Sequence, residues 1–133
     1  MPESNEVQTV SYKLKTGGTT MSQYTVAILH TTSGEVDNPA GANAGKLAGV
    51  LMDASLVAEQ MGAFAVAGIV LVKIASSVSV GDLLIVADTS GRVKAKGSSN
   101  ASGTGIVGRA ISGNTSANSL VLCQLAIPNE ITT

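Results

Sequence analysis

Few residues of this 133-residue chain carry side chains that could catalyse a reaction or bind a metal. It contains one histidine, His30, and one cysteine, Cys123. A zinc site needs three or four such ligands, and a catalytic nucleophile needs a base beside it, so the sequence predicts neither. We expect His30 to be a surface residue at a turn and Cys123, which lies in an apolar run, to be a buried structural thiol.

Two glycine-rich segments resemble phosphate-binding loops but lack parts that such loops need. Residues 41–47, GANAGKL, share only Gly45-Lys46 with a Walker loop, and Leu47 replaces the Ser or Thr that would hold magnesium. Residues 103–108, GTGIVG, match the GxGxxG pattern, yet a loop precedes them and the residues that follow cannot sustain the required helix. We therefore expect no catalytic residue, no cofactor-binding residue and no metal ligand, and a protein that is not an enzyme.

The elements around these residues are predicted to be strands. Leu83 to Ala87 is an unbroken aliphatic run, typical of a strand buried on both faces. The turn DTSG follows, in which Gly91 suits a left-handed conformation, and residues 92–96 return as a half-exposed strand. Further strands are expected at residues 10–14, 24–29, 47–52, 64–66, 69–74, 105–111 and 120–127, and one or two helical turns at residues 53–61.

The same hairpin pattern occurs earlier in the chain. TSGEV at residues 32–36 matches TSGRV at residues 89–93, so that Gly34 lies 57 positions before Gly91. Downstream, residues 47–50 align with 106–109, and residues 64–67 lie about as far along the first copy as residues 120–123 along the second. We interpret the chain as two copies of one β unit, in which Gly34 and Gly91 occupy equivalent turn positions with positive φ. Two copies suit a closed barrel or sandwich better than an extended array.

Composition indicates one domain with an unusually weakly charged surface. Hydrophobic residues make up 44% of the chain and charged residues 13%, against a usual charged share of about 25%. Either Ser, Thr, Asn and Gly cover the surface, or part of it is buried in an oligomer or on a larger partner. A net charge of −1 and 2% aromatic residues argue against nucleic acid as a partner, and no apolar run is long enough to span a membrane.

The first residues allow two interpretations. Residues 1–6 are polar, and an alternating segment then ends at Gly17-Gly18; in that segment Val10, Tyr12 and Leu14 form one face, and Lys13 and Lys15 belong to the other. The segment is either an extended N-terminal arm that pairs outside its own core or the first strand of the barrel. With the arm, the chain divides into an arm (1–20), a compact all-β domain (21–127), built as a barrel or sandwich, and a C-terminal tail (128–133) after Pro128.

Over about residues 24–127 the chain resembles the small head-decoration, or capsid cement, proteins of tailed phages. The resemblance rests on Gly81-Asp82 opening LLIVADTSGRV, on IVGRA at residues 106–110 and on a last strand near the C-terminus. That family has often been labelled a predicted recombinase of the RecA/RadA type, a label for which this sequence gives no physical reason. The resemblance implies a β-barrel-like domain that trimerises at threefold positions of the mature capsid, with an N-terminal arm on the major capsid protein.

The expected function is therefore structural. We expect a decoration protein without cofactors, made in the host cytoplasm, that binds the outer capsid surface of the virion and stabilises the head by bridging major capsid protein subunits. Its partners would be the major capsid protein and itself, as a homotrimer. The capsid-binding arm would consist of Val10, Tyr12, Lys13, Leu14 and Lys15. The alternatives are another phage structural or surface-binding β module, such as a tail or fibre attachment domain, and a nucleotide-dependent recombinase, which the incomplete phosphate loops argue against.

Overall fold

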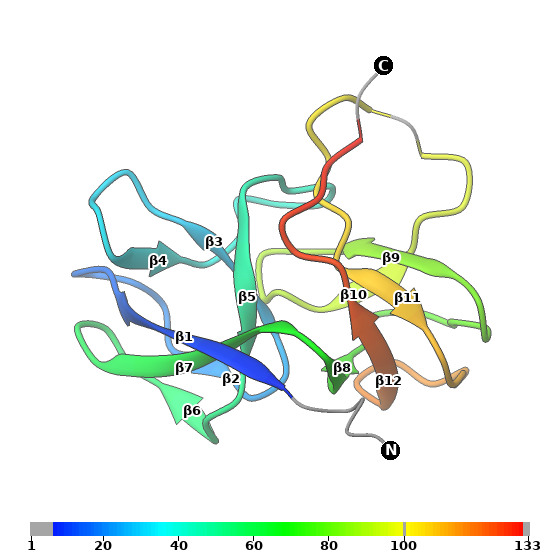
Figure 1. Cartoon of the computed structure of the whole chain (residues 1–133), viewed down its shortest axis with the longest axis horizontal. Coiled ribbons are helices and arrows are strands. Elements are labelled where there is room, and N and C mark those ends of the chain that lie inside the picture. The colour runs from blue at the N-terminus through cyan, green and yellow to red at the C-terminus, as the bar shows by residue number, and fades with distance from the viewer. Residues whose placement is uncertain (1–6, 100, 132–133) are drawn as a thin grey trace.

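The fold is built from β-strands. The computed structural model describes residues 7–99 and 101–131, and strands are the only regular elements in these residues (Figure 1). The strands are β1 (Gln8–Leu14), β2 (Met21–Ser22), β3 (Val26–Leu29), β4 (Glu35–Asp37), β5 (Leu47–Leu51), β6 (Ser55–Leu56), β7 (Met61–Ala67), β8 (Ile69–Lys73), β9 (Leu83–Val86), β10 (Val93–Ala95), β11 (Gly108–Ala110) and β12 (Leu120–Leu125). No helix in this part of the chain could cross a membrane. The prediction of an all-β domain is confirmed.

The first half of the chain forms a closed barrel with the strand order β1-β4-β3-β5-β7. Neighbouring strands are antiparallel except for β1 and β4, which pair in parallel through Leu14 and Val36 and so close the barrel. β3 and β4 form the predicted hairpin, with Gly34 in its turn at a φ of 80°. β2 and β6 form a separate two-stranded sheet.

The second half forms a five-stranded sheet with the order β10-β9-β11-β12-β8. β9 and β10 form the second predicted hairpin, in which Gly91 has a φ of 81°. A parallel bridge between Ile74, just after β8, and Val93 of β10 joins the two outer strands. The second sheet therefore curves almost into a barrel, as Figure 1 shows on its right-hand side.

The two halves are two copies of one unit. In chain order β1, β3, β4, β5 and β7 correspond to β8, β9, β10, β11 and β12, and each copy has the same neighbours in its sheet. The registers agree as well: Leu29 with Val36 corresponds to Val86 with Val93, Ala27 with Gly49 to Leu84 with Gly108, and Leu51 with Phe64 to Ala110 with Cys123. The predicted repeat is confirmed, with one correction: Phe64 corresponds to Cys123 and not to Leu120.

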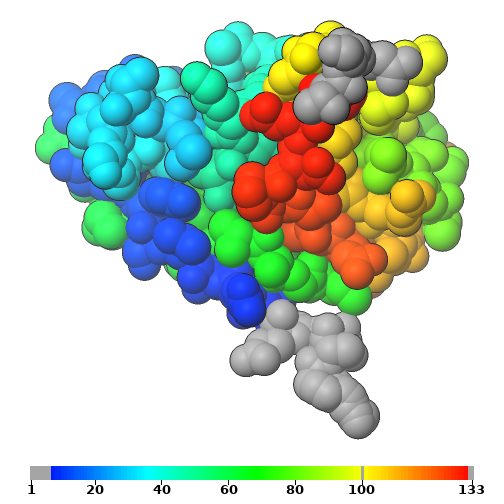
Figure 2. All heavy atoms as spheres, turned by 45° about the horizontal axis from the view of Figure 1, so that its top comes forward, coloured from blue at the N-terminus to red at the C-terminus, as the bar shows by residue number. Residues whose placement is uncertain are grey.

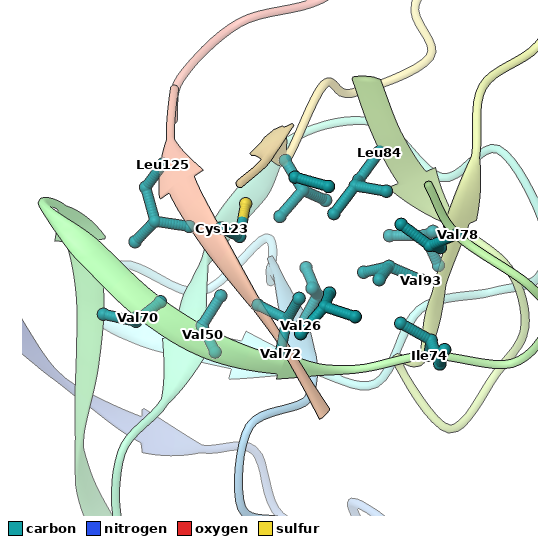
Figure 3. Packing of buried hydrophobic residues seen from close by; sticks show 14 of the residues in the cluster. Val26, Val50, Val70, Val72, Ile74, Val78, Leu84, Val93, Cys123 and Leu125 are labelled. Atoms are coloured by element: carbon teal, nitrogen blue, oxygen red, sulfur yellow. The ribbon is translucent and has the colours of Figure 1, made fainter. Parts of the chain in front are cut away.

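Two apolar clusters fill the molecule, and the first half contributes to both. One cluster lies inside the first barrel around Phe64 and Leu51, neither of which has exposed surface. The other fills the second half and includes Val26 and Val50 from the first half, which lie beside Val72 in Figure 3. Because β5 lies between the clusters, all five of its residues are buried, which explains its uninterrupted apolar sequence.

Backbone hydrogen bonds also join the two halves. In the first barrel, Lys13 of β1 donates its N–H directly to the carbonyl of Gly34 in the β3–β4 turn. At the matching place in the second half, Lys73 donates its N–H to the carbonyl of Tyr24 at 2.9 Å, and Gly91 accepts from the N–H of Val26 at 2.8 Å. The chain just before β3 is thus inserted between β8 and the β9–β10 turn, and the two halves share a core and a backbone ladder.

Residues 8–14 form the first strand of the barrel, which was the second of the two interpretations. β1 pairs with β7 from Gln8 to Lys13, and its last two residues pair with β4. Leu14 is completely buried inside the barrel. An arm uncoupled from the core is therefore not what residues 8–14 form, and the first six residues of the proposed arm lie outside the described part of the chain.

The helical turns expected at residues 53–61 are wrong. This segment contains the short strand β6 and a turn in which Glu59 has a φ of 72°. Asp53 does not cap a helix; its Oδ2 accepts a hydrogen bond from the N–H of Ala63 at 3.0 Å. In the second copy the hydroxyl of Ser112 accepts in the same way from the N–H of Leu122, at 2.8 Å. The strand pairing of the repeat has overridden a weak local helical preference.

β12 ends at Leu125, so the sheet stops before Pro128 as expected, but the residues after Pro128 pair again with another segment. Three backbone hydrogen bonds join residues 129–131 to residues 103–106 in an antiparallel ladder. The described part of the predicted tail, residues 128–131, is therefore docked on the second half.

Candidate interaction surfaces

The two glycine-rich segments pack against each other. Lys46 donates its backbone N–H to Oε2 of Glu130 at 3.0 Å, and Gly105 donates to a carbonyl of the facing loop at 3.0 Å. A side chain on Gly45 would collide with the carbonyl oxygen of Gly103. A phosphate loop needs N–H groups that point at the ligand, whereas these N–H groups donate to protein oxygens. The glycines here permit a close approach of two loops.

The two candidate nucleophile and ligand residues lie apart from any cluster of similar groups. Cys123 has no exposed surface, and burial raises the pKa of its thiol to about 12, as expected for a structural cysteine. His30 is partly exposed; its Nδ1 accepts from the N–H of Thr32 at 3.3 Å and lies 3.5 Å from a carboxylate oxygen of Glu35. Residues 7–99 and 101–131 contain no group of three or more His, Cys, Asp or Glu side chains that could hold a metal.

The three apolar residues predicted for capsid binding lie at different depths along β1. Leu14 is fully buried, and Tyr12 is half-buried with its ring edge against Phe64, at a centroid distance of 5.8 Å. Val10, nearer the start of the strand, is 40% exposed. Only Val10 of the three therefore offers an apolar side chain to a partner, because Tyr12 and Leu14 belong to the first core.

The two lysines of the same prediction are held in ion pairs. Lys13 Nζ lies 3.4 Å from Oε2 of Glu35, and Lys15 Nζ lies 3.6 Å from Oδ2 of Asp37. Both carboxylates belong to β4, the parallel neighbour of β1. These half-exposed pairs contribute little stability, about 0 to 1 kcal/mol each. Because each lysine is paired with a carboxylate, these four residues add no net charge at the end of β1.

Among residues 7–99 and 101–131, no strand pairs with one edge of the first part of β1, which we call its open edge. One side of the strand pairs with β7 along its length, but its other side pairs with β4 only at Lys13 and Leu14. Residues 8–12 therefore present backbone groups that an incoming strand could pair with.

The two turn glycines have the same conformation but different surroundings. Gly34 has open space where a side chain would be. At Gly91 a Cβ would collide with the backbone of Val26, which is hydrogen bonded to Gly91. The second turn therefore needs glycine for two reasons, a positive φ and contact between the halves.

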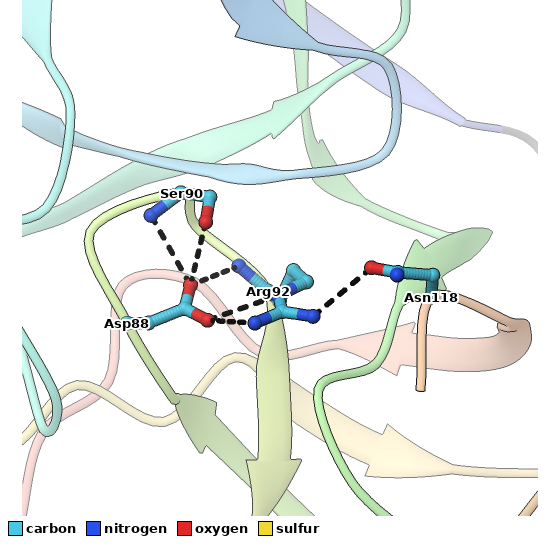
Figure 4. A network of polar contacts seen from close by, with 4 residues as sticks. All are labelled: Asp88, Ser90, Arg92 and Asn118. Atoms are coloured by element: carbon cyan, nitrogen blue, oxygen red, sulfur yellow. Dashed lines mark hydrogen bonds and ion pairs between the residues drawn. The ribbon is translucent and has the colours of Figure 1, made fainter. Parts of the chain in front are cut away.

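A polar network fixes this second turn (Figure 4). Arg92 donates from Nε and Nη2 to Oδ2 of Asp88, at 2.9 and 2.7 Å, and from Nη1 to Oδ1 of Asn118 at 3.0 Å. Ser90 donates to Oδ1 of Asp88. Burial alone would raise the pKa of Asp88, but the hydrogen bonds from Arg92 and Ser90 outweigh burial and lower it below its usual value. The network ties the hairpin to the segment before β12.

A second exposed surface lies on the sheet of the second half, on the side that faces away from its core. We refer to it as the outer face. It comprises Ile69, Leu71, Lys73, Leu83, Arg109, Ile111, Leu120, Leu122 and Gln124. Along β8, β11 and β12 these residues alternate with buried ones; Ile111 directly follows β11, and in β9 only Leu83 is partly exposed. The strand registers place these side chains in rows across the sheet, one of which runs through Leu83, Arg109, Gln124 and Ile69. β12 lies on the near side of the molecule in Figure 2.

The outer face is apolar at its centre and cationic at its border. Ile111, Leu120 and Leu122 are each exposed by 37 to 40%. A hollow of about 450 Å³ lies at one end of the face and is lined in part by Leu83, Arg109 and Gln124. Arg109 donates from Nη1 to the carbonyl of Gly81 at 2.8 Å, which fixes the guanidinium beside the hollow.

Sequence reasoning predicted a strand at residues 120–127 with a buried Cys123 and missed this surface. A signal was present in the alternation Leu120-Val121-Leu122-Cys123-Gln124, which puts two leucines on the face opposite the buried valine and cysteine. One of the two interpretations of the composition pointed the same way, namely that part of the weakly charged surface is buried in an oligomer or on a larger partner.

Comparison with known proteins finds a similarity in three-dimensional structure and none in sequence. No protein-family model matches the sequence, and no curated protein matches it either. Among solved structures, the chain is similar to the crystal structure of the head fiber gp8.5 N base in bacteriophage phi29, with a TM-score of 0.63 and 13% sequence identity. The match covers 93% of this chain and 98% of that one, so that both copies of the repeat are included. The two proteins share a fold.

Proposed function

We propose that this protein is a structural component of a phage head, which binds the outer capsid surface and stabilises the shell by bridging major capsid protein subunits. The observation that carries the proposal is the likeness in fold to the base of a phage head fiber over nearly the full length of both chains. The low charged fraction of 13% supports it, because a protein partly covered by its partners needs less polar surface.

The physical requirements of such a role agree with the fold. A shell under pressure from packaged DNA gains stability from a part that contacts neighbouring subunits at once, and many weak contacts on one particle add up to avidity. A barrel and a strongly curved sheet joined by a shared core hold separate surfaces apart from each other. Such a protein acts through shape and surface chemistry and needs no titratable catalytic group.

The first part of β1 is our proposed contact with the major capsid protein. Val10 offers an exposed apolar side chain, the edge of residues 8–12 is open, and Lys13 and Lys15 lie at the other end of the strand. A strand of the capsid protein could add to this edge through main-chain hydrogen bonds, with Val10 supplying specificity. Tyr12 and Leu14 support the contact from within the barrel.

A homotrimer on the capsid is also part of the proposal, with small and aliphatic side chains at the threefold contact. The supporting observation is again the weakly charged, partly apolar surface. A reconstruction of decorated heads is expected to show three copies around each site. Isolated single copies would contradict the trimer without affecting the proposal of head binding.

Head binding can be tested with purified protein. Heads of the phage that encodes this chain, prepared without it, are mixed with increasing amounts of the protein and sedimented. The protein should co-sediment in a saturable manner and raise the temperature at which the heads release DNA. Protein that remains in the supernatant at every concentration contradicts the proposal.

Attachment of a fibre is the second candidate function, and the description of the similar structure as a head fiber base favours it. In that role the domain would hold a fibre on the head or tail, with no effect on shell stability. The two functions predict different effects on the temperature at which heads release DNA, because only a protein that bridges shell subunits would raise it. Electron microscopy of intact particles would show whether a fibre extends from the bound domain.

A further inference from the structure

The internal repeat gives each surface of one half a counterpart in the other. Leu83 and Arg109 pair across β9 and β11, as Val26 and Val50 pair across β3 and β5. Arg109 then pairs with Gln124 of β12, as Val50 pairs with Ala65 of β7. The row Leu83, Arg109 and Gln124 on the outer face therefore corresponds to Val26, Val50 and Ala65 in the first half.

In the first half this row is a docking surface. Val26, Val50 and Ala65 have at most 1% exposed surface and belong to the core cluster of the second half. The same backbone arrangement thus already binds a protein surface within this chain. The contact is head-to-tail: the first half contributes the face with Val26, Val50 and Ala65, whereas the second half contributes the opposite side of its sheet, which faces its core.

In the second half no described residue covers the corresponding face, and the face is chemically different. Arg109 and Gln124 replace two buried apolar residues and are exposed. A purely apolar surface, like the one that covers the first half, cannot dock over Arg109 and Gln124, because burying an unpaired guanidinium is costly. A partner for this face must therefore supply carboxylates for the cations and aliphatic surface for Leu120, Leu122 and Ile111.

We propose that the outer face is a second docking surface, whose occupant is a protein surface with carboxylates around an aliphatic centre on a neighbouring subunit of the phage shell. Two observations support this occupant. The nine residues of the outer face include two cations, Lys73 and Arg109, and no carboxylate. The counterparts of Leu83, Arg109 and Gln124 in the first half form a contact with the second half, whereas the counterpart of Leu120 is the exposed Met61. Complementary charge at the border and apolar contact at the centre are the usual anatomy of a specific interface.

This inference rests on the proposed function and deepens it. A bridging protein needs two separate attachment surfaces. The open edge of β1 lies on the first half and the outer face on the second. With both occupied, one rigid molecule would connect two shell subunits.

The test compares the binding of matched variants to undecorated heads. Leu120→Asp and Arg109→Glu change an apolar and a cationic residue of the outer face. Leu29→Asp, at a leucine that is 45% exposed on β3, makes the same apolar-to-acidic change outside it. All variants are first compared by thermal melting, and Arg109→Lys is included because it keeps the charge.

The outer-face variants should bind heads about tenfold or more weakly than the wild type, whereas Leu29→Asp should bind within about twofold. Arg109→Lys should recover part of the loss. Wild-type binding that survives both outer-face substitutions would overturn the docking surface and leave the proposed function standing. Failure of the wild type to bind heads would overturn both. Loss of self-association in Leu120→Asp, measured by sedimentation velocity, together with unchanged head binding, would assign the face to a second copy and overturn the proposed occupant.

Discussion

At the scale of single residues, the repeat provides a control within the same protein, because Gly34 and Gly91 occupy equivalent turn positions. Gly34 and Gly91 share a φ near 80°, so replacing either by Ala places a Cβ in the left-handed region, at a cost of about 1 kcal/mol. Only at Gly91 does the new Cβ meet the backbone of Val26. Gly91→Ala should therefore lower the free energy of unfolding by at least about 1 kcal/mol more than Gly34→Ala. Chemical denaturation measures both, and equal losses would show that the contact between the halves can adjust.

Asp88 provides a pH-dependent prediction. Because its pKa is lowered in the folded protein, its contribution to stability is present above about pH 4, the unfolded value, and disappears as the pH falls through the folded value. Asp88→Asn should cost about 1 kcal/mol or less at pH 6, since the group is partly exposed, and progressively less toward pH 2. Melting curves of both proteins across this range test it. A difference that stays constant with pH would mean that the charge of Asp88 does not contribute.

Residue types predicted the structure correctly where the conformation or burial of a residue depends on its neighbours in the sequence. A thiol within an apolar run and two TSG turns predicted a buried Cys123 and two glycines with positive φ, and both predictions are confirmed. The fate of Tyr12 and Leu14 could not be settled in the same way. Alternation along a strand shows that one face is apolar but not whether that face meets its own core or a partner.

At the scale of elements, β1 decides between the two interpretations of the first residues. Deleting residues 1–16 removes a strand that closes the first barrel, together with Leu14 in its core. The truncated protein should fail to fold cooperatively, in contrast to the behaviour of a detachable arm. Circular dichroism and thermal melting provide the measurement. A truncated protein that melts like the full chain would contradict the role of β1 in the barrel.

The exposed part of β1 can be tested separately from its buried part. Val10→Asp changes a side chain that is 40% exposed and should alter the free energy of unfolding by about 0.5 kcal/mol or less. If the start of β1 contacts the capsid, the same variant should bind heads several-fold more weakly. Wild-type affinity in a stable Val10→Asp protein would contradict that contact.

The elements that sequence reasoning missed have a common cause. β6 and the ladder formed by residues 129–131 are short and exist through their partners, β2 and residues 103–106. A few residues of a suitable type, such as those after Asp53, carry too little local signal to override a helical pattern. Pro128 likewise ends a strand locally, but it does not prevent the following residues from pairing elsewhere.

At the scale of the whole molecule, the two halves should unfold together. Val50 belongs to the first half but is fully buried in the cluster that fills the second. Val50→Ala should therefore cost on the order of 2 kcal/mol and lower the midpoint of a single transition. Calorimetry checks this expectation. Two separate transitions, with only one shifted, would contradict a shared core.

The sequence predicted the repeat but not how its copies are joined. Turn residues and apolar runs recur within each copy, so they show in an alignment of the chain with itself. The insertion of the residues before β3 at the edge of the second sheet depends on packing between distant segments. The outer face emerged only when the copies were compared in space, with Arg109 and Gln124 at the positions of Val50 and Ala65.

The central claim is that this molecule binds and bridges the outer surface of a phage head. A reconstruction of heads incubated with the purified protein, compared with untreated heads, tests it most directly. We predict additional density on the outer surface, into which both halves fit, with β1 against one capsid subunit and the outer face against another. Density that touches a single subunit would contradict bridging. Heads that remain identical to the untreated ones would contradict the claim as a whole.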